Sequence, residues 1–330
     1  MFYRLIILFF ISYIVCSQTN YDVYTQSLNC FETGDYICSK DGFEEILTSS
    51  GIHKSAISEN AQFYFFLSSL KLYHSDTEEL FLNFINLYPN SSKKDEAQFY
   101  ISQYFFEAKK YQKVVNTLSE VNLYQSIDNY KAFFYLGYSA FFIKKYDLAK
   151  SCFFELINSL ESSFRDDALY YNSIILLEEG DLDAALFGFN NLQKSIDYSD
   201  KVPYYISSIL YNQNKYNQLV SYLEPILDKQ YYNYNELIAL CAKSFYILKD
   251  YDKTIAYFED YKQLNDTLNR LDLFQMGVSY YNKGLYGFAI NHLYKIVFNN
   301  DSVAQYAFYY LGDSYINTNN RHEAMNAFYS

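Results

Sequence analysis

The residues that could do chemistry are few and scattered. No two of the four histidines, His53, His74, His292 and His322, have a spacing that would bring both rings to one helix face to bind a metal. His322-Glu323 is not followed by a second histidine, so the zinc-protease motif is absent. We therefore expect each histidine to be a surface or packing residue.

Other catalytic patterns are missing as well. The chain has no glycine-rich phosphate loop, no Gly-x-Ser-x-Gly elbow and no kinase signature. Acidic pairs such as Asp166-Asp167 and Glu178-Glu179 could supply a general acid and base, but adjacent residues of a helix point in different directions. We interpret them as solvated residues and expect no enzymatic activity, no cofactor and no metal.

The first 17 residues have the pattern of a secretory signal peptide. Arg4 precedes an apolar run from Leu5 to Val15, and small residues follow it. This run is too short to span a bilayer comfortably. We predict cleavage after Ser17 and export, to the periplasm or the outer membrane of a bacterium. The alternative is a lipid anchor on Cys16, which the bulky Val15 disfavours.

The remaining cysteines are Cys30, Cys38, Cys152 and Cys241. In an exported protein Cys30 and Cys38 could form a disulfide across the turn expected at Gly34-Asp35. The interpretation that we favour is that all four are small packing residues, because Cys152 and Cys241 fall in apolar helical stripes.

Composition favours helices and disfavours nucleic acid. The chain has 3 Pro and 10 Gly among 330 residues, so few residues would break helices. With 26 basic and 38 acidic residues, its net charge is −12. We find no block of lysine and arginine longer than a pair. Such a chain repels phosphate backbones, so nucleic acid is not expected as a partner.

One sequence motif, which we call the phrase, recurs along the chain. It consists of an aromatic residue or leucine, a small or medium residue three positions later, and Phe or Leu four positions after that. It stands as Tyr146-Ala149-Phe153, Leu182-Ala185-Phe189, Tyr216-Leu219-Leu223, Tyr251-Thr254-Phe258 and Tyr286-Ala289-Leu293. The first members are 34 to 36 residues apart. A stack of helix pairs produces such a period, whereas a single helix or strand does not.

A small residue precedes the phrase, as in Leu136-Gly137, Met276-Gly277 and Leu311-Gly312. Together with Phe133 and Ala140, this arrangement resembles the tetratricopeptide repeat. The first-helix Trp of that family is replaced by Phe or Leu, and its terminal Pro survives mainly at Pro89. The resemblance implies an all-α fold, an α-solenoid of stacked antiparallel helix pairs in a right-handed superhelix.

Aligned on the glycine, the resemblance divides the mature chain into repeats. Residues 95–330 form seven units, beginning at Asp95, Tyr130, Asp166, Asp200, Asn235, Arg270 and Gln305. Residues 18–94 form two divergent units, near Asn20 and Ser58. The last unit is incomplete and has no capping helix, so we expect further chain or another subunit to cover it.

Packing expectations follow from the same alignment. Gly137 and Ala149 should face each other, because small side chains let two helices approach closely. Gly180, Asn214 and Gly284 lie between helices, where Gly and Asn suit a left-handed helix end.

The resemblance also implies a concave groove lined by the first helix of each pair. Carried onto this chain, the groove positions form two aromatic rows: Phe99, Phe134, Tyr170, Tyr204, Phe274 and Tyr309 in one, and Phe106, Phe141, Tyr211, Tyr246 and Tyr281 in the other. Such rings suit an extended peptide or a helix of a partner. The alternative is that they pack between repeats, and their exposed area distinguishes the two.

The basic clamp with which some family members hold acidic chaperone termini is missing. Its positions hold Tyr135, Tyr138 and Phe142, then Tyr171, Ile174 and Glu178, with Lys243 and Asn212 isolated. A carboxylate would find few cations there.

We therefore predict a non-enzymatic protein-interaction scaffold of the cell envelope. One alternative is the recruiting arm of a larger enzyme or signalling protein that continues beyond Ser330. Another is an envelope assembly or secretion lipoprotein anchored through Cys16.

Overall fold

The computed structural model describes residues 21–49, 56–264, 267–299 and 301–330. Within these ranges all regular secondary structure is helical, which confirms the predicted all-α fold. The predicted signal peptide, with Cys16, and His53 lie outside the described residues. In the described ranges we find no helix that is both long enough and apolar enough to cross a membrane.

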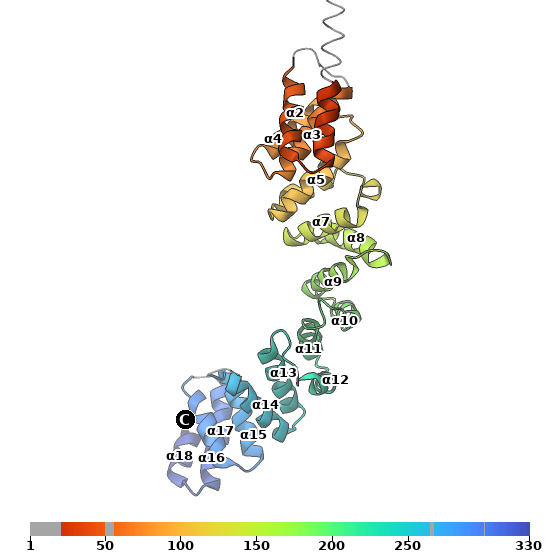
Figure 1. The fold of residues 1–330 in the computed structure, drawn as a ribbon. Helices are drawn as coiled ribbons and strands as arrows, with labels where there is room; N and C mark the ends of the chain where they lie inside the picture. Colours follow the sequence, from red (N-terminus) through yellow and green to blue (C-terminus); the bar gives the residue numbers. More distant parts are fainter. Residues whose placement is uncertain (1–20, 50–55, 265–266, 300) are drawn as a thin grey trace, which may run out of the picture. The chain divides into compact units, whose positions relative to one another are not determined.

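The helices fall into two compact units, one ending at Ala168 and the other beginning at Leu169, within α9 (Arg165–Glu179) (Figure 1). The first unit begins with a helix at residues 21–32 and continues with α2 (Tyr36–Thr48), α3 (Ala56–Lys71), α4 (Thr77–Leu87), α5 (Lys94–Glu107), α6 (Tyr111–Leu118), the short 3-10 helix η1 (Leu123–Gln125), α7 (Asn129–Phe142) and α8 (Tyr146–Asn158).

The second unit repeats the same plan. After α9 it holds α10 (Leu182–Asn191), α11 (Val202–Asn212), α12 (Tyr216–Leu223), η2 (Glu224–Ile226), α13 (Tyr234–Ile247), α14 (Tyr251–Leu264), α15 (Arg270–Asn282), α16 (Tyr286–Leu293), η3 (Tyr294–Ile296), α17 (Ser302–Asn317) and α18 (Arg321–Tyr329).

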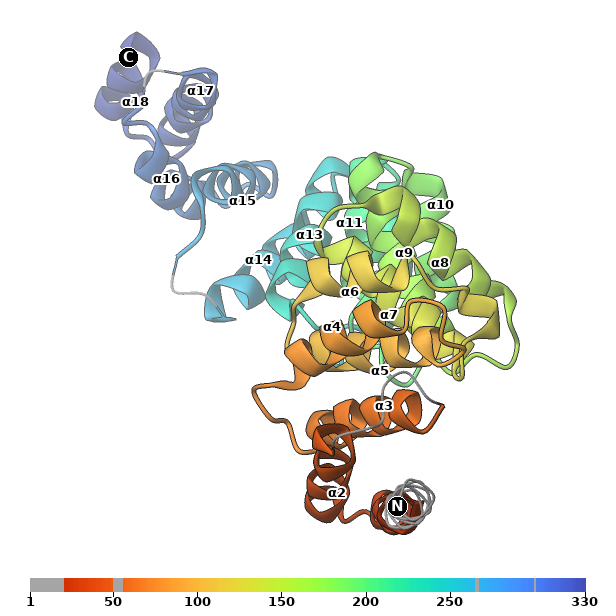
Figure 2. The same ribbon diagram turned by 90° about the horizontal axis from the view of Figure 1, so that it is seen from above.

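Consecutive helices form the stacked pairs. In the first unit α7 packs against α8, and in the second α15 packs against α16 and α17 against α18 (Figures 1 and 2). The first helices of neighbouring pairs also contact each other, α3 with α5 and α5 with α7, then α11 with α13, α13 with α15 and α15 with α17. We call the surface formed by these first helices the first-helix face of each unit.

Each pair turns through one residue in the left-handed conformation. These residues stand 34 to 39 positions apart and are Gly34, Tyr73, Lys109, Lys144, Gly180, Asn214, Lys249, Gly284 and Asn319. In every case the next backbone N–H donates to the carbonyl five residues back, as Lys145 does to Ala140 at 2.8 Å. This bond ends the helix and satisfies a terminal carbonyl. The conformation predicted for glycine and asparagine is confirmed, and Lys and Tyr adopt it too because the bond offsets a cost of about 1 kcal/mol.

The recurring phrase forms the centre of the core. Its last members, Phe153, Phe189, Leu223, Phe258 and Leu293, are all fully buried. So are its middle members, Ala149, Ala185, Leu219, Thr254 and Ala289. The phrase therefore specifies the packing of the second helix against the first.

The glycine of the first helix contacts a different partner from the one expected. A Cβ placed on Gly137 would lie 2.9 Å from both Cys152 Cβ and Phe153 Cε1, so these two side chains, and not Ala149, are its nearest neighbours. The nearest contacts of Gly137 thus lie about one helical turn beyond Ala149 on α8. Close helix approach at Gly137 is confirmed, because no side chain fits between these atoms and the backbone.

A disulfide joins Cys30 to Cys38 and links the first helix to α2. The interpretation of these two cysteines as packing residues was therefore wrong. Cys152 and Cys241 are free and buried, as expected. Burial raises the pKa of both thiols to about 12, which keeps them protonated and unreactive near neutral pH.

Candidate functional site

The structure divides the eleven predicted groove aromatics by exposure. Phe99 and Tyr170 are 4% and 9% exposed, so they are packing residues that cannot offer a surface to a partner. Tyr309 is 58% exposed. The other eight are half-buried: Phe106, Phe134, Phe141, Tyr204, Tyr211, Tyr246, Phe274 and Tyr281. These eight both pack between helices and keep part of each ring at the surface.

In the first unit, rings from α5, α6 and α7 contact one another. We call this the α5–α7 aromatic cluster, and its members are Phe106, Tyr111, Phe134, Tyr138 and Phe142. Phe106 lies 6.1 Å from Phe134 and 5.2 Å from Tyr138, centroid to centroid. Phe142 is exposed and stacks on Tyr111 at 4.9 Å. The cluster thus runs continuously from one first helix to the next.

In the second unit, a polar version of this arrangement spans α15 and α17. Tyr310 lies between Tyr281, at 5.0 Å, and Tyr309, at 5.4 Å. The Tyr281 hydroxyl donates to Asp313 Oδ2 at 2.7 Å. This hydrogen bond, together with burial, raises the pKa of Tyr281 to about 12. We call these four residues the α15–α17 tyrosine cluster.

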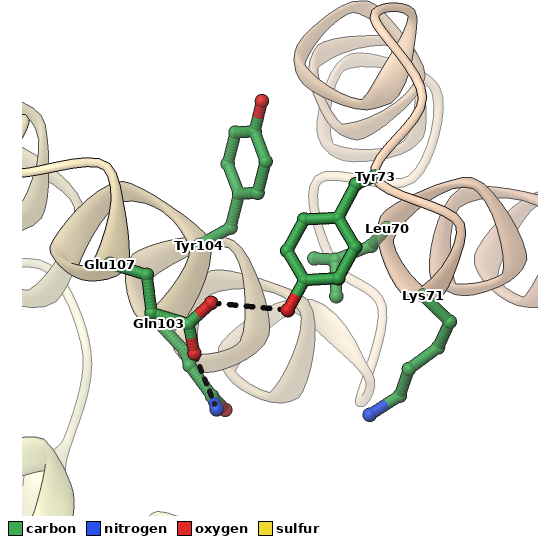
Figure 3. Close-up of a pocket in the computed structure, with 6 residues that line it drawn as sticks. All are labelled: Leu70, Lys71, Tyr73, Gln103, Tyr104 and Glu107. Carbon is green, nitrogen blue, oxygen red and sulfur yellow. Dashed lines mark hydrogen bonds between the residues drawn. The ribbon is translucent and has the colours of Figure 1, made fainter.

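A pocket of about 60 Å³ opens between the end of α3 and the C-terminal part of α5 (Figure 3). Its walls are Leu70, Lys71, Tyr73, Gln103, Tyr104 and Glu107. The Tyr73 hydroxyl donates to Glu107 Oε2 at 3.3 Å, and Gln103 Nε2 donates to Glu107 Oε1 at 3.2 Å. Figure 3 shows Tyr73 pointing toward Glu107, with Lys71 on the other side of the pocket.

The lysine that sequence analysis found isolated has a partner. Lys243 Nζ lies 3.2 Å from Oδ1 of Asp272, a carboxyl that is fully buried. Burial raises the pKa of Asp272, although Lys243 opposes this shift. Lys243 is therefore already engaged in an ion pair within its own unit.

The histidines within the described ranges follow the expectation. His292 is buried, its Nδ1 lies 2.8 Å from the Phe288 carbonyl oxygen, and its ring stacks on Tyr280. His74 and His322 are exposed. Among the described residues, no group of three or more His, Cys, Asp or Glu side chains could hold a metal ion.

Comparison with known proteins gives a likeness in fold. No family model matches the sequence. No curated protein matches it either. Among solved structures, it is similar to the C-terminal part of a TPR repeat-containing protein from Cytophaga hutchinsonii, with 15% identity and a TM-score of 0.50 over 69% of this chain and 92% of that one. This chain has the tetratricopeptide-repeat fold.

Two further tetratricopeptide-repeat structures show weaker likeness. One is a repeat protein from Parabacteroides merdae, with 11% identity and a TM-score of 0.44 over 79% of this chain and 99% of that one. The other is YrrB, described as a TPR protein with an unusual peptide-binding site, with 18% identity and a TM-score of 0.45 over 54% and 90% of the two chains.

The sequence analysis did not single out the turn residue Tyr73 or four residues of first helices within this tetratricopeptide-repeat fold. The four are Tyr104, Glu107, Tyr310 and Asp313. The prediction considered only two positions of each repeat, those of the two aromatic rows, and these five residues stand at other positions. The recurrence of the left-handed turn residue could have indicated Tyr73, because it occupies the place of Gly180 and Asn214 in its own pair.

Proposed function

We propose that this chain is a non-enzymatic protein-interaction scaffold that binds a peptide or helix of a partner on its first-helix faces. One observation carries the proposal: the rings of the α5–α7 aromatic cluster contact one another across two successive first helices while remaining partly exposed. Tyr and Phe offer large contact area with few rotamers to lose, so a partly exposed band of them favours protein recognition.

The shape of the band favours an elongated ligand. In the first unit the band runs from α5 through α6 to α7. In the second unit the α15–α17 tyrosine cluster likewise joins two successive first helices, α15 and α17. An extended peptide, or one helix, can contact successive repeats in this direction. A compact small molecule would contact only one of them.

Crosslinking tests the proposal. A photoreactive benzoylphenylalanine placed at Phe142 or Tyr309 should capture a protein partner from cell-envelope extracts. The matched controls are Phe154 and Phe288, which are also exposed aromatic residues but lie on the second helices α8 and α16. Equal capture from the second helices would contradict a first-helix binding face.

We further propose that the scaffold works in the cell envelope after export. The support is the pattern of residues 1–17 alone. The mass of the mature protein tests it, since cleavage after Ser17 leaves Gln18 as the first residue and lipidation would leave a modified Cys16. An intact Met1 in the mature protein would refute both.

A further inference from the structure

We propose that the pocket between α3 and α5 recognises a lysine or arginine side chain of the bound partner segment. This inference rests on the proposed function, because it assigns the chemistry of one position of the ligand. The pocket supplies the two features that bind an organic cation in proteins: a carboxylate, Glu107, and an exposed aromatic ring, Tyr73, with Tyr104 beside it.

Glu107 is exposed and is held by neutral groups. Among the described residues, the hydrogen bonds that its two oxygens accept come from Tyr73 and Gln103. These bonds orient the carboxylate without neutralising it. Glu78 on α4 is different, because Lys110 and Lys113 both form ion pairs with it. A cationic side chain from outside would therefore gain more at Glu107 than at Glu78.

Tyr73 supplies the ring that a ligand cation would contact. Its centroid is 6.5 Å from that of Tyr104, and the two planes are inclined by 42°. Tyr104 already has Lys110 Nζ 5.6 Å from its centroid, so a ligand cation is placed nearer Tyr73, within the roughly 6 Å at which the attraction is significant. Tyr73 is 70% exposed and sits at the left-handed turn that ends α3, so its ring stands out from the helix pair and is reachable by a ligand. The net charge of −12 adds attraction at longer range.

Lys71 carries the competing charge on the same pocket. Its ammonium lies 5.9 Å from the ring centroid of Tyr100, and its side chain is exposed. If the pocket received an anion, Lys71 would be the binding group and Glu107 would oppose it. Substituting Glu107 or Lys71 should therefore change the affinity in opposite directions for a cationic and an anionic ligand. The direction of each change in affinity shows which kind of ligand binds.

The experiment uses a displayed library of random twelve-residue peptides selected on the intact protein. Enriched peptides are then titrated against the wild type, Glu107→Gln, Lys71→Gln and Glu79→Gln. Glu79 is the matched control, because it is an exposed carboxylate of the same unit on the second helix α4, and its substitution changes the net charge equally. Circular dichroism of each variant reports whether it is folded.

We expect enriched peptides to share a basic residue. Their affinity should fall about fivefold in Glu107→Gln, as an exposed charge pair predicts, and rise about twofold in Lys71→Gln. Replacing the basic residue by citrulline or norleucine should remove the difference between wild type and Glu107→Gln. Glu79→Gln should bind like the wild type.

Three outcomes would overturn the inference. Peptides that bind more tightly to Glu107→Gln and more weakly to Lys71→Gln would show an anion pocket. Peptides that crosslink to Phe142 but respond to neither substitution would leave the scaffold function standing and remove the cation site. Absence of any enriched peptide at the first-helix face would refute the scaffold function itself.

Discussion

The pair α7–α8 of the first unit and the pair α17–α18 of the second share the same repeat residues but not the same surroundings. Gly137 and Phe153 of the first pair correspond to Gly312 and Phe328 of the second. Phe153 is fully buried, whereas Phe328 is 49% exposed; within the described residues α18 packs against α17. The same repeat residue therefore contributes more to the free energy of unfolding where another helix of the stack covers it.

The largest predicted effect tests this directly. Gly137→Leu should lower the free energy of unfolding by about 3 kcal/mol, because the new side chain meets the buried Cys152 and Phe153. Gly312→Leu should cost less than about 1 kcal/mol, since the nearest atoms that it meets belong to the half-exposed ring of Phe328, which can move into solvent. Urea unfolding of both variants measures the difference, and equal losses would remove the asymmetry.

The disulfide lies in the first unit, so its removal tests whether the two units unfold separately. Loss of the Cys30–Cys38 bridge, which closes a loop of 8-residue separation, should destabilise the N-terminal helix pair by about 2.5 kcal/mol. The paired variant Cys30→Ser with Cys38→Ser should show faster amide exchange in residues 21–48 and no change in α15–α18. Uniform loss of protection over both units would mean that they unfold together.

A smaller effect concerns the polar ring cluster of the second unit. Tyr281→Phe removes the hydrogen bond to Asp313 and should cost about 1 kcal/mol. Because the pKa of Tyr281 is raised to about 12 when folded, the wild type holds this stabilisation up to about pH 10 and loses it as the pH rises toward 12. Thermal melts between pH 9 and 11.5 should therefore converge for the two proteins.

Phe141 provides the control for that prediction, since it occupies the corresponding place on α7, has no hydroxyl group to ionise, and contacts the rings of Phe142 and Tyr146. Phe141→Leu should change stability without changing its dependence on alkaline pH. A parallel pH dependence in this variant would assign the effect to other tyrosines.

The smallest predicted effect involves the buried carboxyl of Asp272. Burial raises its pKa in the folded protein, so folding binds a proton and the stability gained from Asp272 falls as the pH rises through that raised pKa. Asp272→Asn removes this dependence, although Lys243 then loses its charged partner. The melting temperature of the wild type relative to Asp272→Asn should increase as the pH is lowered from neutral toward the ordinary carboxyl pKa of about 4. A decrease would show that Lys243 dominates the site.

Much of the fold could be predicted from the sequence because repeat packing is local. The phrase from Tyr146 to Phe153 lies on one helix, so its period of three and four residues fixes which side is buried. Glycine at positions 180 and 284 likewise predicted the left-handed turns. That Cys152 and Phe153 lie nearest to Gly137 was not predicted, because helix crossing geometry depends on the whole interface.

The candidate site could be predicted only in outline. The aromatic rows were placed on the first helices, but their exposure was not predictable. Phe99 and Phe106 stand on the same helix α5, and only Phe106 keeps surface area, although its ring contacts α7. The Cys30–Cys38 bridge was left open for the same reason, since spacing alone allows a disulfide without requiring one.

By itself, the sequence determined the helices, their turns and the buried face of each pair, because these depend on residues within one repeat. Only the tertiary structure decided which rings stay at the surface and which polar groups meet. Glu107 faces Tyr73, and Asp313 faces Tyr281, across residues 32 to 34 positions apart. Such contacts arise when neighbouring repeats stack, so they depend on the angle and distance between helices, which no single repeat encodes.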